Sequence, residues 1–95
     1  MRIDIVEINH NLFDVNIVDK VETSHRIELD DDYHQELSKG KLQKKQLILF
    51  SIEFLLSREP NTAILSSFKL QLINSYFSEF ENEIIVKIEE SQKWK

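Results

Sequence analysis

The sequence predicts an α+β fold in which an N-terminal three-stranded antiparallel meander packs on a C-terminal helical half with a central buried helix. Apolar and polar residues alternate through residues 1–29, which indicates strands with one buried face. Nine of the fifteen residues in 42–56 are apolar, and the only glycine and the only proline, Gly40 and Pro60, lie on either side of them. A chain of 95 residues can build one modest core. We therefore expect a single domain, with the meander in residues 1–29 and the helical half in residues 30–95.

Three segments of the N-terminal part are predicted as strands. Their inward positions alternate with polar residues and are Ile3 and Ile5; Phe13, Val15 and Ile17; and Val21, Thr23, His25, Ile27 and Leu29. The polar joints at residues 9–11 and 19–20 are short, which favours consecutive hairpins. Val6 and Ile8 are out of phase with Ile3 and Ile5, so we expect a bulge or a strand with two apolar faces.

A short helix is predicted directly after the meander. Asp30 can cap it, and two further aspartates stand in its first turn, where the helix dipole favours negative charge. Lys39 falls in the predicted last turn, and Gly40 follows it. This order of residues is typical of the two ends of a helix.

A long helix is then predicted from about Leu42 to Ser57, because Pro60 cannot continue it. Placed on a helix, the apolar residues of 42–56 cover most of the circumference and leave Gln46, Glu53 and Ser57 as a narrow polar stripe. We expect such a helix to be buried by the rest of its own protein or by a second copy.

The C-terminal third carries weaker patterns. A brief turn with Ile64, Leu65 and Phe68 is predicted, followed by a short helix within residues 70–77. Residues 78–81 have the spacing of a capping box and predict a last helix, although the β-branched residues of 83–89 fit a strand equally well. Trp94 lies beyond this element, and we expect it to pack loosely on its own domain.

Composition excludes several kinds of chemistry. The chain has no cysteine, which excludes disulfides, thiolate nucleophiles, iron–sulfur clusters and cysteine-based zinc sites. Asp4 and Glu7 interrupt the apolar run that a signal peptide needs, and no stretch approaches the roughly 18 apolar residues of a membrane span. We therefore expect a cytoplasmic protein. The net charge of −5 is concentrated in residues 1–40, which disfavours sequence-independent binding of nucleic acid.

We predict no metal, cofactor or catalytic residue. His10, His25 and His34 lack the spacing of a metal site, and the run Asp30-Asp31-Asp32 lacks the alternating spacing of a calcium loop and is explained by helix capping. No serine has the context of a nucleophile, and a single glycine cannot form a phosphate-binding loop. No small-molecule site is evident, and enzymatic activity is not expected.

Two groups of charged residues are candidate contacts. The first is a basic patch of Lys39, Lys41, Lys44 and Lys45; the last three lie near the start of the long helix, where positive charge is unfavourable and an anionic group can compensate. The alternatives are an acidic group of the chain itself, a partner's acidic surface, a phosphate, or a solvated charged loop. The second is Arg58 with Glu59, which we expect to tie the following turn or, if Arg58 projects alone into a cleft, to contact a ligand carboxylate.

Residues 51–60 (SIEFLLSREP), followed by Ile64, Leu65, Phe68, Leu70, Ile73 and residues 76–80 (YFSEF), resemble a group of small uncharacterised bacterial proteins. Proteins of that group carry similar segments in the same order, namely FEFLL, REP, SIL, F, L, I and YFPE(F/Y). The resemblance covers about residues 27–82. It implies a shared fold and a bacterial origin but no activity, cofactor or site residue. The chain departs from the pattern at Ser78, where proline is expected.

Two classes of function follow. The first is a small non-enzymatic protein-interaction or accessory module that associates with a protein partner or with itself as a homodimer, because open sheet edges and a largely apolar helix favour association. The alternative is a nucleic-acid-associated regulator that uses the Lys39 to Lys45 patch. A small-molecule-binding or catalytic domain would need a pocket that no sequence pattern reveals.

Overall fold

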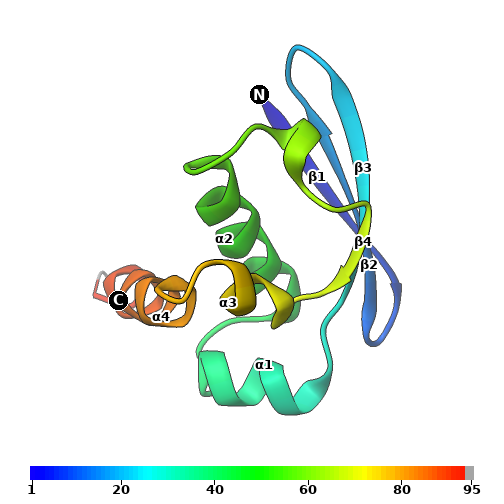
Figure 1. The fold of residues 1–95 in the computed structure, drawn as a ribbon. Coiled ribbons are helices and arrows are strands. Elements are labelled where there is room, and N and C mark those ends of the chain that lie inside the picture. The colour runs from blue at the N-terminus through cyan, green and yellow to red at the C-terminus, as the bar shows by residue number, and fades with distance from the viewer. Residues whose placement is uncertain (94–95) are drawn as a thin grey trace.

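The computed structural model describes residues 1–93 and has a mixed sheet with helices on one of its faces (Figure 1). In chain order the elements are β1 (Arg2–Asn9), β2 (Leu12–Val18), β3 (Glu22–Glu28), α1 (Asp31–Ser38), α2 (Lys44–Leu56), the 3-10 turn η1 (Asn61–Ala63), β4 (Ser67–Lys69), α3 (Leu72–Tyr76) and α4 (Phe80–Ser91). The strand order is β1-β2-β3-β4. The predicted α+β class and the antiparallel meander of the first three strands are confirmed.

The sheet has a fourth strand that the sequence patterns did not indicate. β4 pairs with β3 in parallel, with Ser67, Phe68 and Lys69 opposite residues 26–28 of β3. The prediction of a turn at Phe68 was therefore wrong. The strand is only three residues long and carries one apolar residue, so it has no alternating pattern from which it could be predicted.

The meander buries one face against the helices. Phe13, Val15, Ile17 and Ile27 are almost fully inaccessible, whereas β1 at the sheet edge is mostly exposed. The pairing of β1 with β2 shifts register between Glu7 and Asn9, which agrees with the predicted bulge. On the opposite face, neighbouring strands are joined by polar side-chain pairs, such as Arg26, which donates two hydrogen bonds to Asp14.

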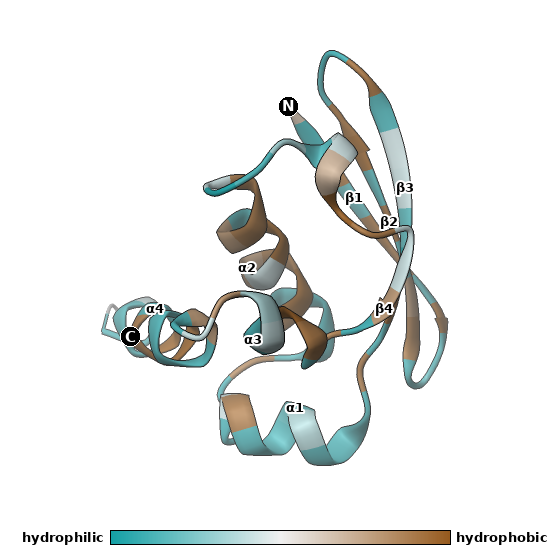
Figure 2. Cartoon of the chain, in the orientation of Figure 1, coloured by the Kyte–Doolittle hydropathy of each residue, from teal (hydrophilic) through white to brown (hydrophobic). Residues whose placement is uncertain are grey.

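α2 packs against the sheet and is the most apolar helix of the chain (Figure 2). It begins at Lys44, two residues later than predicted, where the side chains of Gln43 and Gln46 form a capping box. Burial on nearly all sides is not confirmed. Leu47, Ile48, Ser51, Ile52, Phe54 and Leu55 are buried, but Leu49, Phe50 and Leu56 are only partly covered and Lys45, Gln46 and Glu53 are exposed.

α1 begins where its residues predict, and it ends one residue earlier than predicted, before Lys39. The Asp30 side chain accepts a hydrogen bond from the Tyr33 amide and caps the helix, as predicted. At the other end Lys39 lies beyond the last turn and adopts a left-handed conformation with φ of 53°, and Gly40 follows with φ of 77°. Left-handed residues commonly end helices, so the chain reverses here toward α2.

Residues 83–89 are helical, and α4 buries Phe80, Ile84 and Ile88 on one stripe. The predicted capping box at residues 78–81 is absent: the cap residue is Glu79, whose side chain makes no cap hydrogen bond, and the Glu81 amide donates to Asn74 Oδ1 at 3.3 Å instead. Trp94 lies outside the described residues. Among the helices of residues 1–93, none combines the length and hydropathy needed to cross a bilayer.

The Tyr33 hydroxyl joins α1 to α4 by donating a 2.8 Å hydrogen bond to the Glu81 carboxylate. Burial and this hydrogen bond raise the pKa of Tyr33, so the folded protein keeps the phenol protonated. The stabilisation is present below pH about 10, where a free tyrosine is neutral, and is lost as the pH rises further.

We therefore expect Tyr33→Phe to lower the free energy of unfolding by about 1–2 kcal/mol at neutral pH, and the gap to wild type to shrink above pH about 10. Urea unfolding of both proteins at several alkaline pH values checks this. A gap that stays constant across the alkaline range would contradict it.

Candidate functional site

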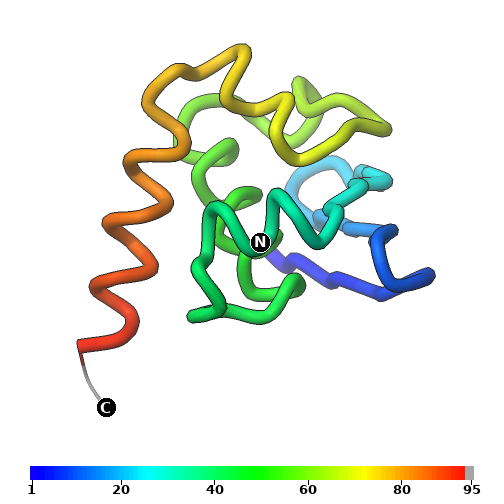
Figure 3. Tube along the Cα trace, turned by 90° about the horizontal axis from the view of Figure 1, so that it is seen from below, coloured from blue at the N-terminus to red at the C-terminus, as the bar shows by residue number. Residues whose placement is uncertain are grey.

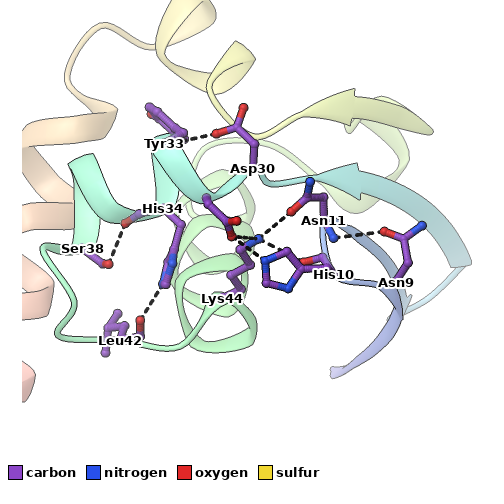
Figure 4. Close-up of polar contacts among 10 residues, drawn as sticks. Asn9, His10, Asn11, Asp30, Tyr33, His34, Ser38, Leu42 and Lys44 are labelled. Atoms are coloured by element: carbon purple, nitrogen blue, oxygen red, sulfur yellow. Dashed lines mark hydrogen bonds and ion pairs between the residues drawn. The ribbon is translucent and has the colours of Figure 1, made fainter.

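A polar cluster forms where the β1–β2 turn meets the first turns of α1 and α2. The Lys44 Nζ lies 2.8 Å from Asp31 Oδ1 and donates hydrogen bonds to the His10 carbonyl at 3.0 Å and to Asn11 Oδ1 at 2.8 Å. Figure 4 shows the Lys44 side chain directed at His10 and Asn11. Only 10% of the Lys44 side chain is exposed, so its ammonium group is fully committed to this chain.

Asp31 is the anion that compensates the lysine at the start of α2. The hydrogen bond from Lys44 lowers the pKa of Asp31, with a further contribution from the His10 ring, whose Nε2 lies 2.6 Å from Asp31 Oδ1. Of the alternatives left open by the sequence, Lys44 therefore has an acidic partner within its own chain. The cluster ties three segments together and is a structural clamp.

The four lysines of the predicted patch are not equivalent. Lys44 is held inside the polar cluster, whereas Lys39, Lys41 and Lys45 are exposed around the turn between α1 and α2. A partner's anion would therefore meet three of the four predicted residues.

The three histidines lie apart and have different partners. His10 contacts Asp31, and the His34 Nε2 bonds the Leu42 carbonyl at 2.6 Å, which closes the turn between α1 and α2 (Figure 4). His25 is buried on β3. Within residues 1–93, no group of three or more histidine or acidic side chains is arranged around a common point where a metal ion could bind.

Arg58 does not project alone into a cleft. Its guanidinium group lies 3.2 Å from Glu79 Oε2 and 2.6 Å from Glu83 Oε2, and it stacks on the Phe54 ring at 3.7 Å from the centroid. The Arg58 hydrogen bond contributes to lowering the pKa of Glu79, after the larger contribution of a backbone hydrogen bond. Arg58 thus fixes the end of α2 to the start of α4, which makes it structural.

Glu59, the neighbour of Arg58, lines an apolar hollow of about 340 Å³. The hollow lies between the end of α2, η1, β4 and α3, and its wall is formed by Leu55, Glu59, Ala63, Ile64, Leu65, Phe68, Leu72, Ile73, Tyr76 and Phe77. Leu65 is 47% exposed and Tyr76 is 66% exposed, so apolar surface at the rim faces solvent. Glu59 is the only charged residue of the wall.

The Glu59 carboxylate has no hydrogen bond or ion pair with any residue in the part of the chain that the structure describes. Arg58, the nearest cation in sequence, is turned to Glu79 and Glu83 instead. The hollow therefore combines an apolar wall with one half-buried carboxylate that no cation of residues 1–93 engages.

A partly buried chain of hydrogen bonds holds the rim of the hollow to the sheet. The Leu65 carbonyl can only accept, so the His25 Nδ1 at 2.7 Å carries a proton and donates it. The His25 Nε2 lies 2.8 Å from Thr23 Oγ1, which accepts a bond from the Asn61 amide at 2.9 Å. The segment from η1 to β4 is thus fastened to β3 at Leu65.

The sequence patterns placed Ile64, Leu65 and Phe68 in a brief turn and residues 70–77 in a short helix, and they indicated no hollow between them. Ile64 and Ile73 are buried, whereas Leu65 and Tyr76 are exposed. Leucine and tyrosine are also common in protein cores, so residue type alone does not distinguish the exposed pair from the buried one. The only signal of the exposed pair was its place in the weakly patterned segment of residues 61–77.

Comparisons of the chain with models of known protein families, with characterised proteins and with solved structures find no match. The resemblance to small bacterial proteins therefore stays a prediction.

Proposed function

We propose that this protein is a small interaction module that binds a short segment of a partner protein in the apolar hollow. The observation that carries the proposal is one wall that combines exposed Leu65 and Tyr76 with the Glu59 carboxylate, which has no ion-pair partner among residues 1–93. Apolar surface left open beside a single charge is typical of a recognition site rather than of a core.

The wall also indicates what the segment should contain. Leucine, isoleucine and aromatic side chains favour one bulky apolar anchor, and pairs of aromatic rings add specific edge-to-face contacts. Glu59 favours a lysine or arginine next to that anchor, because a half-buried carboxylate is stabilised by an opposite charge. We therefore propose a partner segment with a bulky apolar residue flanked by cations.

Catalysis is not part of the proposal. The polar groups of the wall are a carboxylate and a tyrosine hydroxyl, and they offer neither a nucleophile with its base nor a pair of carboxylates. Binding of nucleic acid by Lys39, Lys41 and Lys45 stays a prediction, and the engagement of Lys44 with Asp31 weakens it.

The test uses three fluorescein-labelled five-residue peptides, each with a central phenylalanine flanked by two lysines, two glutamines or two glutamates. In anisotropy titrations we expect the lysine peptide to bind best and Glu59→Gln to weaken it roughly two- to fivefold, as for a partly exposed ion pair. We expect Leu65→Glu to abolish binding of all three peptides.

The matched control is Val21→Glu, which adds the same charge at a 55% exposed valine outside the hollow and should leave binding unchanged. Equal affinity for the lysine and glutamate peptides, or binding that survives Leu65→Glu, would refute the proposal.

A further inference from the structure

The chain itself contains a segment with the chemistry that the hollow favours. Residues 93–95 read Lys93-Trp94-Lys95, which is a bulky aromatic residue flanked by two cations, and Trp94 is the only tryptophan. We propose that the hollow of one copy receives the Trp94 side chain of a second copy, with a flanking lysine at Glu59. This inference rests on the proposed function and names the partner.

The segment cannot fill the hollow of its own chain. Phe77, part of the wall, lies just before α4, and the twelve residues of α4 then extend for about 18 Å. Figure 3 shows α4 running away from α3 along its whole length. Gln92 lies at the far end, where its side chain is 3.5 Å from the Lys41 carbonyl. The backbone from Gln92 to residue 94 spans at most about 7 Å, which is less than half the length of α4, so we infer that a second copy supplies the tryptophan.

Charge favours the same arrangement. Two copies with a net charge of −5 each repel one another at long range, so a stable contact needs a local pairing of opposite charges. Glu59 within the hollow and the lysines beside Trp94 provide that pairing. Each copy has one hollow and one such segment, so two copies that exchange segments form a closed pair.

The first readout is the emission of the single tryptophan as the protein concentration rises from about 1 μM to about 1 mM, the range of weak affinities. We expect the Trp94 emission maximum to shift to shorter wavelength and the light-scattering mass to rise from one copy toward two. Leu65→Glu should remove both changes, and Val21→Glu should keep them.

A mixing experiment separates a contact between copies from packing within one copy. Trp94→Ala has an intact hollow but no tryptophan, and Leu65→Glu has the tryptophan but a blocked hollow. The proposal requires the blue shift to be absent in Leu65→Glu alone and to return when excess Trp94→Ala is added. A blue shift in Leu65→Glu alone, or none after mixing, would overturn it.

The phenylalanine peptide with two lysines distinguishes the two proposals. If Trp94→Ala binds that peptide while no shift appears on mixing, the hollow is an interaction site and the second copy is not its occupant. If the peptide does not bind either, the proposed function fails as well.

Discussion

Phe80→Ala is expected to lower the free energy of unfolding by about 3–5 kcal/mol, the usual cost of removing a buried aromatic ring. Phe80 is fully inaccessible at the first residue of α4, and its ring meets that of Phe54 edge to face at a centroid distance of 5.1 Å. The ring anchors α4 to α2 beside the Arg58 contact. A domain of this size has a total stability of about 5–10 kcal/mol, so the variant should be largely unfolded in mild denaturant.

Tyr76→Ala is the matched control, because it also removes an aromatic ring but at a 66% exposed position. We expect it to change stability by less than about 0.5 kcal/mol. Urea unfolding followed by circular dichroism measures both variants. A cost below about 1 kcal/mol for Phe80→Ala would show that α4 does not depend on this ring for its attachment, contrary to the packing seen here.

Periodicity predicted the elements that have a long, regular pattern. The alternation of Phe13, Val15 and Ile17 with polar residues fixed which face of β2 is buried, because side chains alternate strictly along a strand. The capping aspartate, Asp30, located the start of α1 for an equally local reason. In α4 the spacing of Ile84 and Ile88 outweighed their β-branched preference for a strand, since both reach the core only on a helix.

Features that depend on residues far apart in the chain were not predictable. β4 forms because Phe68 is brought beside β3, and its three residues carry no pattern of their own. The position of Lys44 at the start of a helix indicated that an anionic group compensates its charge. The sequence around Lys44 did not identify that group as Asp31, which lies thirteen residues earlier. The hollow depends on how η1 and α3 meet the end of α2, and the exposed fraction of Tyr76 follows only from that arrangement.

His25→Ala is expected to lower the free energy of unfolding by about 2–4 kcal/mol, because it creates a cavity and deprives the Leu65 carbonyl of its hydrogen bond from the imidazole. His25 is 3% exposed on β3. Its ring connects the Thr23 hydroxyl to the Leu65 carbonyl, so the substitution removes the side-chain contact that fixes Leu65, while the β3–β4 pairing and the Asn61 hydrogen bonds remain. We therefore also expect the lysine-flanked phenylalanine peptide to bind His25→Ala less tightly under conditions where the variant remains folded.

The other two histidines provide a graded comparison. His34 is half-buried with one hydrogen bond to a backbone carbonyl, so His34→Ala should cost about 0.5–1.5 kcal/mol and leave peptide affinity unchanged. His10 has a side chain that is 73% exposed, and His10→Ala should have the smallest effect of the three. Urea unfolding gives the order of the costs, and anisotropy gives the affinities. If His25→Ala costs no more than His10→Ala, or if it loses stability while the peptide affinity stays at the wild-type value, then the imidazole does not hold the wall of the hollow. The wall is then held by the β3–β4 pairing, the Asn61 hydrogen bonds and the packing of Ile64 and Phe68.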